Sequence, residues 1–361
     1  MRVGLSALCG VTGGPATYAR ELAAALARRD DVELSVFTDR PDQFDLSPSQ
    51  LVEVSFRGGR DRLRWQYLAL GKAVRRSRVE VFHDTKNAWP LFLPTPGVVT
   101  VHDLAYHSHP ETFPRSSRMF LKRATAHACR KARVVVVPSA WTGAELARVH
   151  PFCADRIEVV HHGIRGPQDV TEEQAEDFRR RFELPERFVL HVGTVQARKN
   201  VDLLVRAARQ VRKTSPELRV VVVGRRGWQS EAAFAEIERD DTAHWLGEVD
   251  DQDLACAYHA ADSFCSPSAD EGFGFTVADA IHRGLPTLVA DRGSLPEVTG
   301  DAALHTELDE PSVARALDRL WKDEVLRERL RSAGPQRAAS FTWDKAAEAT
   351  LQSYRRALGR A

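Results

Sequence analysis

Cysteine is scarce in this chain and shows no paired arrangement. The 361 residues contain five cysteines, Cys9, Cys129, Cys153, Cys256 and Cys265, and their spacing includes no Cys-x-x-Cys pair and no Cys/His pattern typical of a zinc site. An odd, scattered set argues against a disulfide framework and favours a reducing compartment. We therefore expect a cytoplasmic protein without structural zinc.

The sequence also lacks a long apolar run and a strong net charge. No apolar stretch approaches the roughly 18 residues that a membrane-spanning helix needs. Arg2 and the apolar residues Val3–Leu8 could mimic a signal peptide, but the run is short and leads into Gly13-Gly14 and an amphipathic helix, so we interpret it as a first strand. The formal net charge of +1 excludes chain-wide electrostatic attraction to nucleic acid, and no nucleic-acid partner is expected.

The first half of the chain alternates predicted strands and helices. The whole chain has 361 residues, of which 43% are hydrophobic, and this length and composition suit two domains that each have a hydrophobic core. We predict strands at Val3–Leu8, Val32–Thr38, Val79–His83, Val98–Val101, Val134–Val137 and Ile157–Val160, and helices at Thr17–Ala27, Arg60–Arg76, Ser116–Ala132 and Trp141–Val149. This order predicts an α/β fold with a parallel sheet covered on both faces.

A polar, charged segment from Gly163 to Glu186 separates this half from a second one. The alternation then resumes, with strands at Phe188–Val192, Arg219–Val223, His244–Leu246, Ser263–Cys265 and Thr287–Ala290, and helices at Thr171–Phe182, Val201–Val211, Glu231–Arg239, Gln252–Ala260, Thr276–Arg283, Pro311–Ala333 and Trp343–Leu358. We place one domain at residues 1–165 and another at 166–340. Two Rossmann-like halves in series predict a cleft, with ligands bound at the carboxyl ends of the strands.

The stretch Ser266–Glu297 carries the strongest chemical signal. A predicted strand, a turn containing Gly272 and Gly274, and a short helix together direct backbone N–H groups at one point, where an anion is stabilised. Glu271 lies in the same turn. A carboxylate beside an anion is unfavourable unless it binds a neutral polar ligand, and a sugar carrying a diphosphate supplies both groups.

A second glycine turn carries two cations. The segment Gly193–Asn200 follows the first strand of the second half and places Arg198 and Lys199 before a helix. Cations and N–H groups in this arrangement suit a diphosphate. The alternative is a solvated basic turn, which the helix dipole makes less favourable, because positive charge is disfavoured at a helix N-terminus.

Two candidates in the first half follow strands. The turn Gly10–Gly14, with Gly13 and Gly14, precedes the first helix and could admit a ligand to the backbone; it could also be a tight turn without a ligand. With Asp39 it hints at a dinucleotide fingerprint, but the glycine spacing does not match. His102 follows a buried strand and could act as a hydrogen-bonding or acid/base group, or be structural. His83, His107 and His109 are its nearby competitors.

Other polar patterns have more ordinary explanations. Asp251 and Asp253 show the spacing of a metal-assisted sugar-nucleotide site, but they open a helix, so we predict caps and no metal. His161-His162 has no evident third ligand. The basic runs Arg57–Arg78 and Arg115–Arg123 could contact an anionic acceptor or a membrane surface, or be solvated helix faces.

These motifs together resemble the retaining GT-B glycosyltransferases of family GT4, in the mannosyltransferase-like branch, over nearly the whole chain. The resemblance is carried by Pro267-Ser268, Glu271–Ala280, Gly284–Pro286, Leu295–Val298, Gly300–Ala303, Val99–Asp103, Gly193–Asn200, Phe341–Trp343 and Tyr354. It implies that the final segment, 341–361, crosses back onto the first domain as a helix.

The resemblance also implies residue roles. Glu271 would contact donor-sugar hydroxyls, Arg198 and Lys199 would neutralise the diphosphate, and His102 would lie beside the transferring sugar. The backbone of Gly272, Phe273, Gly274, Phe275 and Thr276 would hold sugar and diphosphate, with Gly13 and Gly14 near the phosphates. Asp279 stands where the family usually has a ribose-binding Glu. Thr194 and His162 replace a frequent Arg and Asn.

We accordingly expect a metal-independent enzyme without a cofactor. It would transfer a hexose from a nucleotide-diphosphate sugar to a hydroxyl of a glycan, a lipid-linked or a small-metabolite acceptor. GDP-mannose is the first choice of donor, with UDP-glucose or UDP-N-acetylglucosamine next. The alternatives are a catalytically silent sugar-nucleotide binding protein and an NAD-dependent oxidoreductase. We expect a monomer or weak dimer, with peripheral contact at the inner face of the membrane as a further hypothesis.

Overall fold

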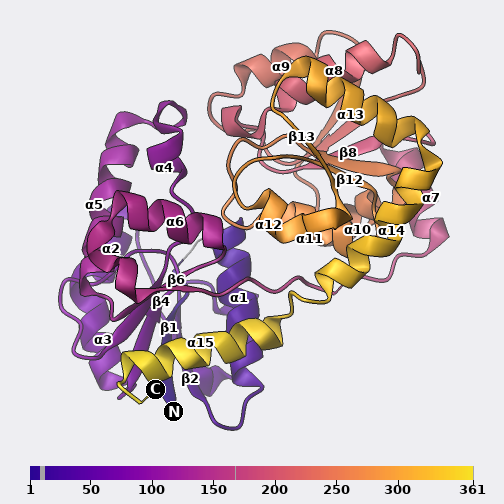
Figure 1. Ribbon diagram of the computed structural model, residues 1–361. Helices are drawn as coiled ribbons and strands as arrows, with labels where there is room; N and C mark the ends of the chain where they lie inside the picture. The colour runs from indigo at the N-terminus through magenta and orange to yellow at the C-terminus, as the bar shows by residue number, and fades with distance from the viewer. Residues whose placement is uncertain (9–12, 167, 361) are drawn as a thin grey trace. The chain divides into compact units, whose positions relative to one another are not determined.

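The chain folds into two compact units. The computed structural model describes residues 1–8, 13–166 and 168–360. One unit comprises Met1–Gly163 together with Phe341–Ala361, and the other comprises Ile164–Ser340 (Figure 1). The first unit is therefore built from two separate segments of the chain.

A seven-stranded parallel sheet forms the centre of the first unit, in the order β3-β2-β1-β4-β5-β6-β7. Its strands are β1 (Arg2–Ser6), β2 (Glu33–Thr38), β3 (Leu51–Glu53), β4 (Val81–Asp84), β5 (Gly97–Thr100), β6 (Val134–Val137) and β7 (Ile157–Val159). All four residues of β4, β5 and β6 are buried, as expected for central parallel strands that are covered on both faces. The sequence prediction missed β3, a three-residue strand at the sheet edge.

Helices cover both faces of this sheet. They are α1 (Gly14–Ala27), α2 (Gly59–Arg64), α3 (Leu70–Arg76), α4 (Ala105–Ser108), α5 (Arg115–Lys131), α6 (Ala140–Val149) and α15 (Trp343–Ala357). The single helix predicted over Arg60–Arg76 is interrupted by a π-helical turn at Trp65–Ala69, which joins α2 to α3. The wider turn changes which side chains face the sheet beyond it.

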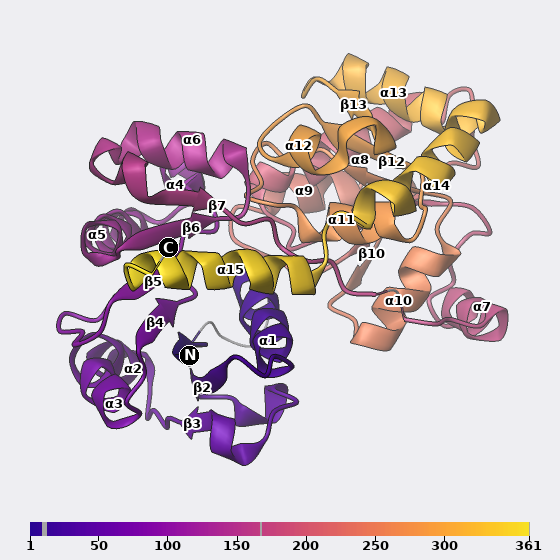
Figure 2. The same ribbon diagram turned by 60° about the horizontal axis from the view of Figure 1, so that its bottom comes forward.

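Helix α15 packs on α1, β5 and β6 (Figure 2). Thr342 caps its first turn by accepting a hydrogen bond from the Lys345 N–H group. Deeper in the core, His83 Nδ1 lies 2.8 Å from the Tyr354 hydroxyl, and His83 Nε2 lies 2.7 Å from the Thr100 hydroxyl. Buried polar groups in contact of this kind define the position of the helix, because each would be costly to leave unpaired.

The second unit contains a six-stranded parallel sheet in the order β10-β9-β8-β11-β12-β13. Its strands are β8 (Val189–Val192), β9 (Val220–Val223), β10 (Ala243–Gly247), β11 (Ser263–Ser266), β12 (Thr287–Ala290) and β13 (Leu304–Thr306). Strands β8 and β11 are direct neighbours, although β9 and β10 lie between them in sequence. The carboxyl ends of β8, β11 and β12 therefore lie next to one another at one edge of the sheet.

The helices of this unit are α7 (Glu172–Arg181), α8 (Val201–Val211), α9 (Glu231–Ile237), α10 (Asp251–Ala260), α11 (Phe275–His282), α12 (Leu295–Thr299), α13 (Glu310–Lys322) and α14 (Glu324–Ala338). The prediction of one helix over Pro311–Ala333 was wrong. The helix is interrupted at Asp323, whose side chain accepts a hydrogen bond from the Leu326 N–H group and so caps the start of α14. The sequence prediction also missed α12 and β13, because elements this short show no clear periodicity of apolar residues.

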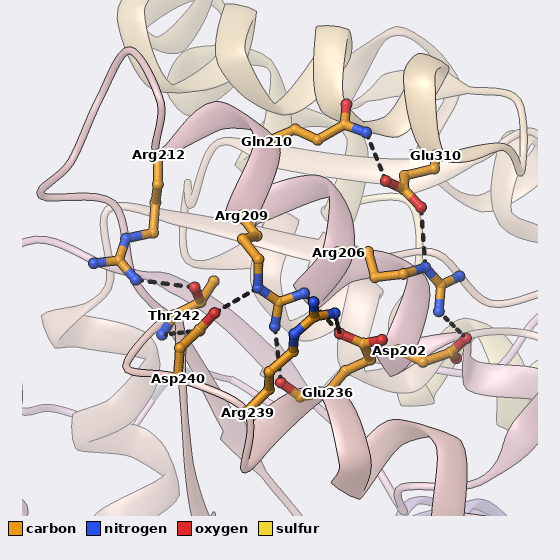
Figure 3. A network of polar contacts seen from close by, with 10 residues as sticks. All are labelled: Asp202, Arg206, Arg209, Gln210, Arg212, Glu236, Arg239, Asp240, Thr242 and Glu310. Atoms are coloured by element: carbon orange, nitrogen blue, oxygen red, sulfur yellow. Dashed lines mark hydrogen bonds and ion pairs between the residues drawn. The ribbon is translucent and has the colours of Figure 1, made fainter.

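A surface network of charged side chains joins α8, α9 and α13 (Figure 3). Arg209 bridges Glu236 and Asp240, with a nitrogen–oxygen distance of 2.6 Å to each. Arg206 pairs with Asp202 at 2.9 Å and with Glu310 at 3.0 Å. These shared pairs run along α8 from its first turn, at Asp202, to Arg209 and hold the outer helices of the unit together.

Candidate active site

Two loops at the carboxyl ends of the strands in the second unit are joined to each other by hydrogen bonds. The loop after β8 carries Arg198, whose carbonyl accepts a hydrogen bond of 2.8 Å from the Ala269 N–H group in the loop after β11. The Asn200 side chain donates to the Pro267 carbonyl, also at 2.8 Å. The two segments that sequence analysis singled out separately are therefore one structure.

Glu271 and the two predicted cations form a nearly buried cluster. Lys199 Nζ donates to Glu271 Oε1, and Arg198 Nη1 lies 3.5 Å from Glu271 Oε2. The three side chains are only 11–17% exposed. Arg198 is held further by a 2.6 Å hydrogen bond to the Asp270 carbonyl. The cluster carries one net positive charge when all three groups are ionised.

The carboxyl group of Glu271 is ionised at neutral pH. Burial by itself raises the pKa of Glu271, but the charges of Lys199 and Arg198, with hydrogen bonds from Lys199 and Ser268, bring it down to about 2. An ionised carboxylate only accepts hydrogen bonds. Glu271 is thus suited to bind hydroxyl groups and unsuited to donate a proton.

The backbone of the turn places a helix end beside this cluster. Helix α11 begins at Phe275, after Gly274 with a φ of +84°. The positive φ favours glycine here, and a Cβ atom on Gly274 would also lie 2.8 Å from Leu295 Cδ2, so the Leu295 side chain would have to shift. The Ser294 N–H group holds the other side of the turn by donating to the Glu271 carbonyl at 3.1 Å. The positive end of the α11 dipole thus adjoins Glu271–Gly274.

Asp279 lies one turn into α11, on the same helix face as Phe275. It is close enough to the buried Tyr258 phenol to add to the effect of burial in raising the Tyr258 pKa. The Tyr258 hydroxyl donates to the Thr276 carbonyl at 3.0 Å and braces the first turn of the helix. Sequence reasoning missed this bracing tyrosine, because nothing in the local pattern links α10 to α11.

Of the predicted glycine turn Gly10–Gly14 in the first unit, the structure describes Gly13 and Gly14. Gly13 has a φ of +94° and precedes α1, which begins at Gly14. Gly10, Val11 and Thr12 of the predicted turn lie outside the described residues.

His102 has hydrogen-bond partners at both ring nitrogens. Its Nε2 lies 2.7 Å from the Thr85 carbonyl, and its Nδ1 lies 3.3 Å from His162 Nε2. A carbonyl only accepts, so the proton of the neutral ring is on Nε2 and His162 donates to Nδ1. Burial lowers the pKa of His102 to about 4, so the ring is neutral at pH 7.

Both halves of the chain match known protein families. Residues 12–165 match the family described as Glycosyltransferase Family 4, and residues 172–337 match Glycosyl transferases group 1. The chain belongs to the group 1 and family 4 glycosyltransferases.

The relatives of this glycosyltransferase include enzymes with different acceptors. O-antigen chain mannosyltransferase B of Escherichia coli is 27% identical over 72% of this chain and 70% of its own length. D-inositol 3-phosphate glycosyltransferase of Salinispora arenicola is 28% identical and covers 96% of this chain and 87% of its own length. Neither name by itself assigns a donor or an acceptor to this enzyme.

Solved structures confirm the predicted α/β fold with two Rossmann-like domains of the GT-B class. Sucrose-phosphate synthase from Thermosynechococcus elongatus superimposes with a TM-score of 0.79 at 20% identity over the whole of both chains. Anabaena HepE in complex with UDP-glucose gives 0.76 at 17% identity, over 98% of this chain and all of its own. In the described part of the glycosyltransferase, no helix is long and apolar enough to cross a membrane.

The Asp-rich segment of the glycosyltransferase has structural partners. Asp250 caps α10 by accepting a 2.8 Å hydrogen bond from the Asp253 N–H group. The Asp253 carboxylate pairs with Arg181, and Asp251 lies 3.6 Å from Arg165. Across residues 1–8, 13–166 and 168–360, no cluster of three or more His, Cys, Asp or Glu is placed to hold a metal ion.

Three of the remaining histidine candidates, His83, His109 and His161, also have partners, whereas the buried His107 Nε2 has no hydrogen-bond partner among the described residues. His83 is fully buried between Tyr354 and Thr100, and burial lowers its pKa to about 3. The His109 ring lies 3.5 Å from Glu111. His161 contacts the ring of Phe341. His83 and His161 therefore join distant parts of the first unit, whereas the His109 contact is local.

Proposed function

We propose that this glycosyltransferase transfers a hexose from a nucleotide-diphosphate sugar to an acceptor hydroxyl with retention of configuration. The observation that carries the proposal is the cluster of Lys199, Arg198 and Glu271 beside the N-terminus of α11. Positive charge and a helix dipole suit a diphosphate, and an ionised carboxylate suits the hydroxyls of the attached sugar. GDP-mannose is our first choice of donor, supported by the mannosyltransferase relative, with UDP-glucose or UDP-N-acetylglucosamine next.

The cluster has separate tasks in the proposed reaction. The bond between the anomeric carbon and the diphosphate oxygen breaks, and a bond to the acceptor oxygen forms on the same face. Negative charge grows on the leaving diphosphate, where Arg198 and Lys199 stabilise it. The acceptor proton passes to a diphosphate oxygen. Glu271 orients the sugar by accepting hydrogen bonds, because its low pKa makes it a poor proton carrier.

Other residues complete the proposal. Asp279 contacts the ribose, and the turn from Gly272 to Thr276 holds the phosphates. His102 lies beside the sugar in a positioning role, since its Nε2–H is already donated to the Thr85 carbonyl. Gly13 and Gly14 contact the donor through their backbone. Independence from metal ions and a cytoplasmic location stay predictions.

The proposal is tested with Lys199→Ala. Removing one preorganised charge contact is expected to lower turnover by roughly 10²-fold or more. Lys213→Ala is the matched control, because Lys213 is exposed and follows the opposite end of α8. Turnover of Lys199→Ala close to that of the control, in a folded protein, would remove the basis of the proposal.

The donor is identified by thermal shift with GDP, UDP, dTDP and ADP, since a ligand that binds the native state raises its stability. Stabilisation by GDP above the other three supports the first choice. Nucleotide release with and without acceptor separates transfer from silent binding, and calorimetry with NAD tests the oxidoreductase alternative. Binding without release under any acceptor would favour the silent binding protein.

A further inference from the structure

A separate pocket lies at the amino ends of the strands in the first unit. Its volume is about 710 Å³, and its lining includes Gly97, the first residue of β5, and Arg133, which immediately precedes β6. His102 follows the carboxyl end of β5, so it lies at the opposite edge of the same sheet. None of the residues that line the pocket belongs to the proposed donor site, and two of them, Lys72 and Arg75, come from the basic run Arg57–Arg78.

All the charged side chains that line this pocket are positive. Four of its lining residues are cations, Lys72 and Arg75 from α3, Lys131 at the end of α5, and Arg133. No carboxylate lines the pocket, and none of the four side chains forms an ion pair with any described residue. Four such cations around one hollow strongly favour an anion.

The rim of the pocket is apolar and unusually exposed. Phe92, Leu68 and Leu91 are 77%, 57% and 47% exposed, and all three line the pocket. Trp89, by contrast, lines the pocket but is buried. Large apolar side chains gathered at a cationic rim indicate a ligand that has an apolar part beside its charge.

The loop that presents these side chains is held rigidly. The Leu91 N–H group donates to the Tyr67 carbonyl at 2.9 Å, within the π-helical turn between α2 and α3. Gly71 lets the loop approach α3 closely, because a Cβ atom there would lie 1.8 Å from the Phe92 carbonyl oxygen. Prolines at 90, 94 and 96 restrict the backbone further. Phe92 thus points outward from a fixed loop.

We propose that this pocket binds the phosphate headgroup of an anionic lipid at a membrane surface. Lys72, Arg75, Lys131 and Arg133 surround the headgroup, while Leu91 and Phe92 enter the acyl region beside it. The charge complementarity selects an anion, and the exposed apolar rim selects a lipid over a fully hydrated phosphate. The proposal does not depend on the donor or on the reaction at Glu271.

The test uses the full chain and sedimentation with vesicles of phosphatidylcholine, with and without one-third phosphatidylglycerol. We expect binding only to the anionic vesicles, and its loss at high salt. The double variant Lys72→Ala/Arg75→Ala is expected to bind about 30-fold more weakly, from about 1 kcal/mol for each cation near an anionic surface. Phe92→Ser is expected to weaken binding by about tenfold.

The matched control is Arg64→Ala/Arg76→Ala. It removes two exposed cations that form no ion pair from the same stretch of helix, but neither residue lines the pocket. Equal weakening by both double variants would mean general surface charge and would overturn the pocket assignment. Equal binding to neutral vesicles would overturn the role of the cations.

A soluble arm separates the lipid from a free phosphate. Glycerol phosphate is added to the protein, and thermal stability is followed with wild type and Lys72→Ala/Arg75→Ala. If glycerol phosphate stabilised wild type but not the double variant, and wild type did not bind vesicles, the lipid assignment would be overturned in favour of a soluble anion. Unchanged stabilisation of the double variant by the preferred nucleotide shows that the chain remains folded.

Discussion

Glu271→Gln tests the electrostatics of the site through stability. The Glu271 pKa is about 2 in the folded protein, against an ordinary value of 4.5. Because the folded value is the lower one, the ionised carboxylate stabilises the fold above pH 4.5, and this contribution is lost as the pH falls towards 2. A lowering of this size corresponds to about 3 kcal/mol at pH 7.

Glutamine keeps the shape of the side chain but carries no charge. It leaves Lys199 and Arg198, which are 12% and 17% exposed, without their carboxylate. We therefore expect Glu271→Gln to be less stable than wild type by about 3 kcal/mol at pH 7. The difference should shrink to about 1.4 kcal/mol at pH 3, where an unfolded glutamate is already protonated.

Urea unfolding of both proteins at pH 7, 5, 4 and 3 measures this difference. Glu307→Gln is the matched control, because Glu307 pairs with Arg292 at 3.0 Å but is 61% exposed. A pair so exposed contributes about 0.2–1 kcal/mol or less. The reasoning would be refuted if the difference in the free energy of unfolding between wild type and Glu271→Gln stayed constant from pH 7 to pH 3. It would also be refuted if that difference were no larger than the one for Glu307→Gln.

Three further predictions concern backbone, core and cap. Gly274→Ala is expected to destabilise the chain by about 1–3 kcal/mol, from the positive φ and the contact with Leu295, and to weaken nucleotide binding in a thermal-shift assay; unchanged binding would separate the turn from the donor site. Tyr354→Phe leaves His83 Nδ1 without its partner, and urea unfolding should show a loss of about 1–3 kcal/mol, whereas no loss would mean that water replaces the hydroxyl. Asp250→Ala is expected to lower the free energy of unfolding by about 1 kcal/mol, because a helix cap is lost, and to turn over substrate as fast as wild type, with or without EDTA; a loss of turnover in the variant or in EDTA that a divalent cation restores would contradict the cap.

Regular, strongly periodic elements were predicted well from the sequence. The strands Val134–Val137 and Thr287–Ala290 and the helix Val201–Val211 have the predicted bounds, because apolar runs and an i, i+3, i+4 pattern reflect burial directly. The errors lie where local pattern is weak. The break at Asp323 depends on one capping side chain inside an otherwise helical pattern, and β3 and β13 have only three residues each.

Local sequence features identify the chemical groups that the proposed donor site can use. A glycine turn before a helix, a carboxylate within it and a pair of cations after another strand are all local features, and each can be interpreted from backbone chemistry alone. Their proximity to one another depends on the order of the strands in the sheet. Lys199 and Glu271 are 72 residues apart, and they pair because β8 and β11 are neighbours in the sheet.

That pairing changes the chemistry that the residues would have separately. It keeps the Glu271 carboxylate ionised in a buried place and reduces the charge that two cations present to a diphosphate. Likewise, the sequence placed His102 after a strand, but the contacts with Thr85 and His162 decide its tautomer, and burial in the fold keeps the ring neutral by lowering its pKa. Composition and spacing name the groups, whereas their protonation depends on neighbours that the fold brings from distant parts of the chain.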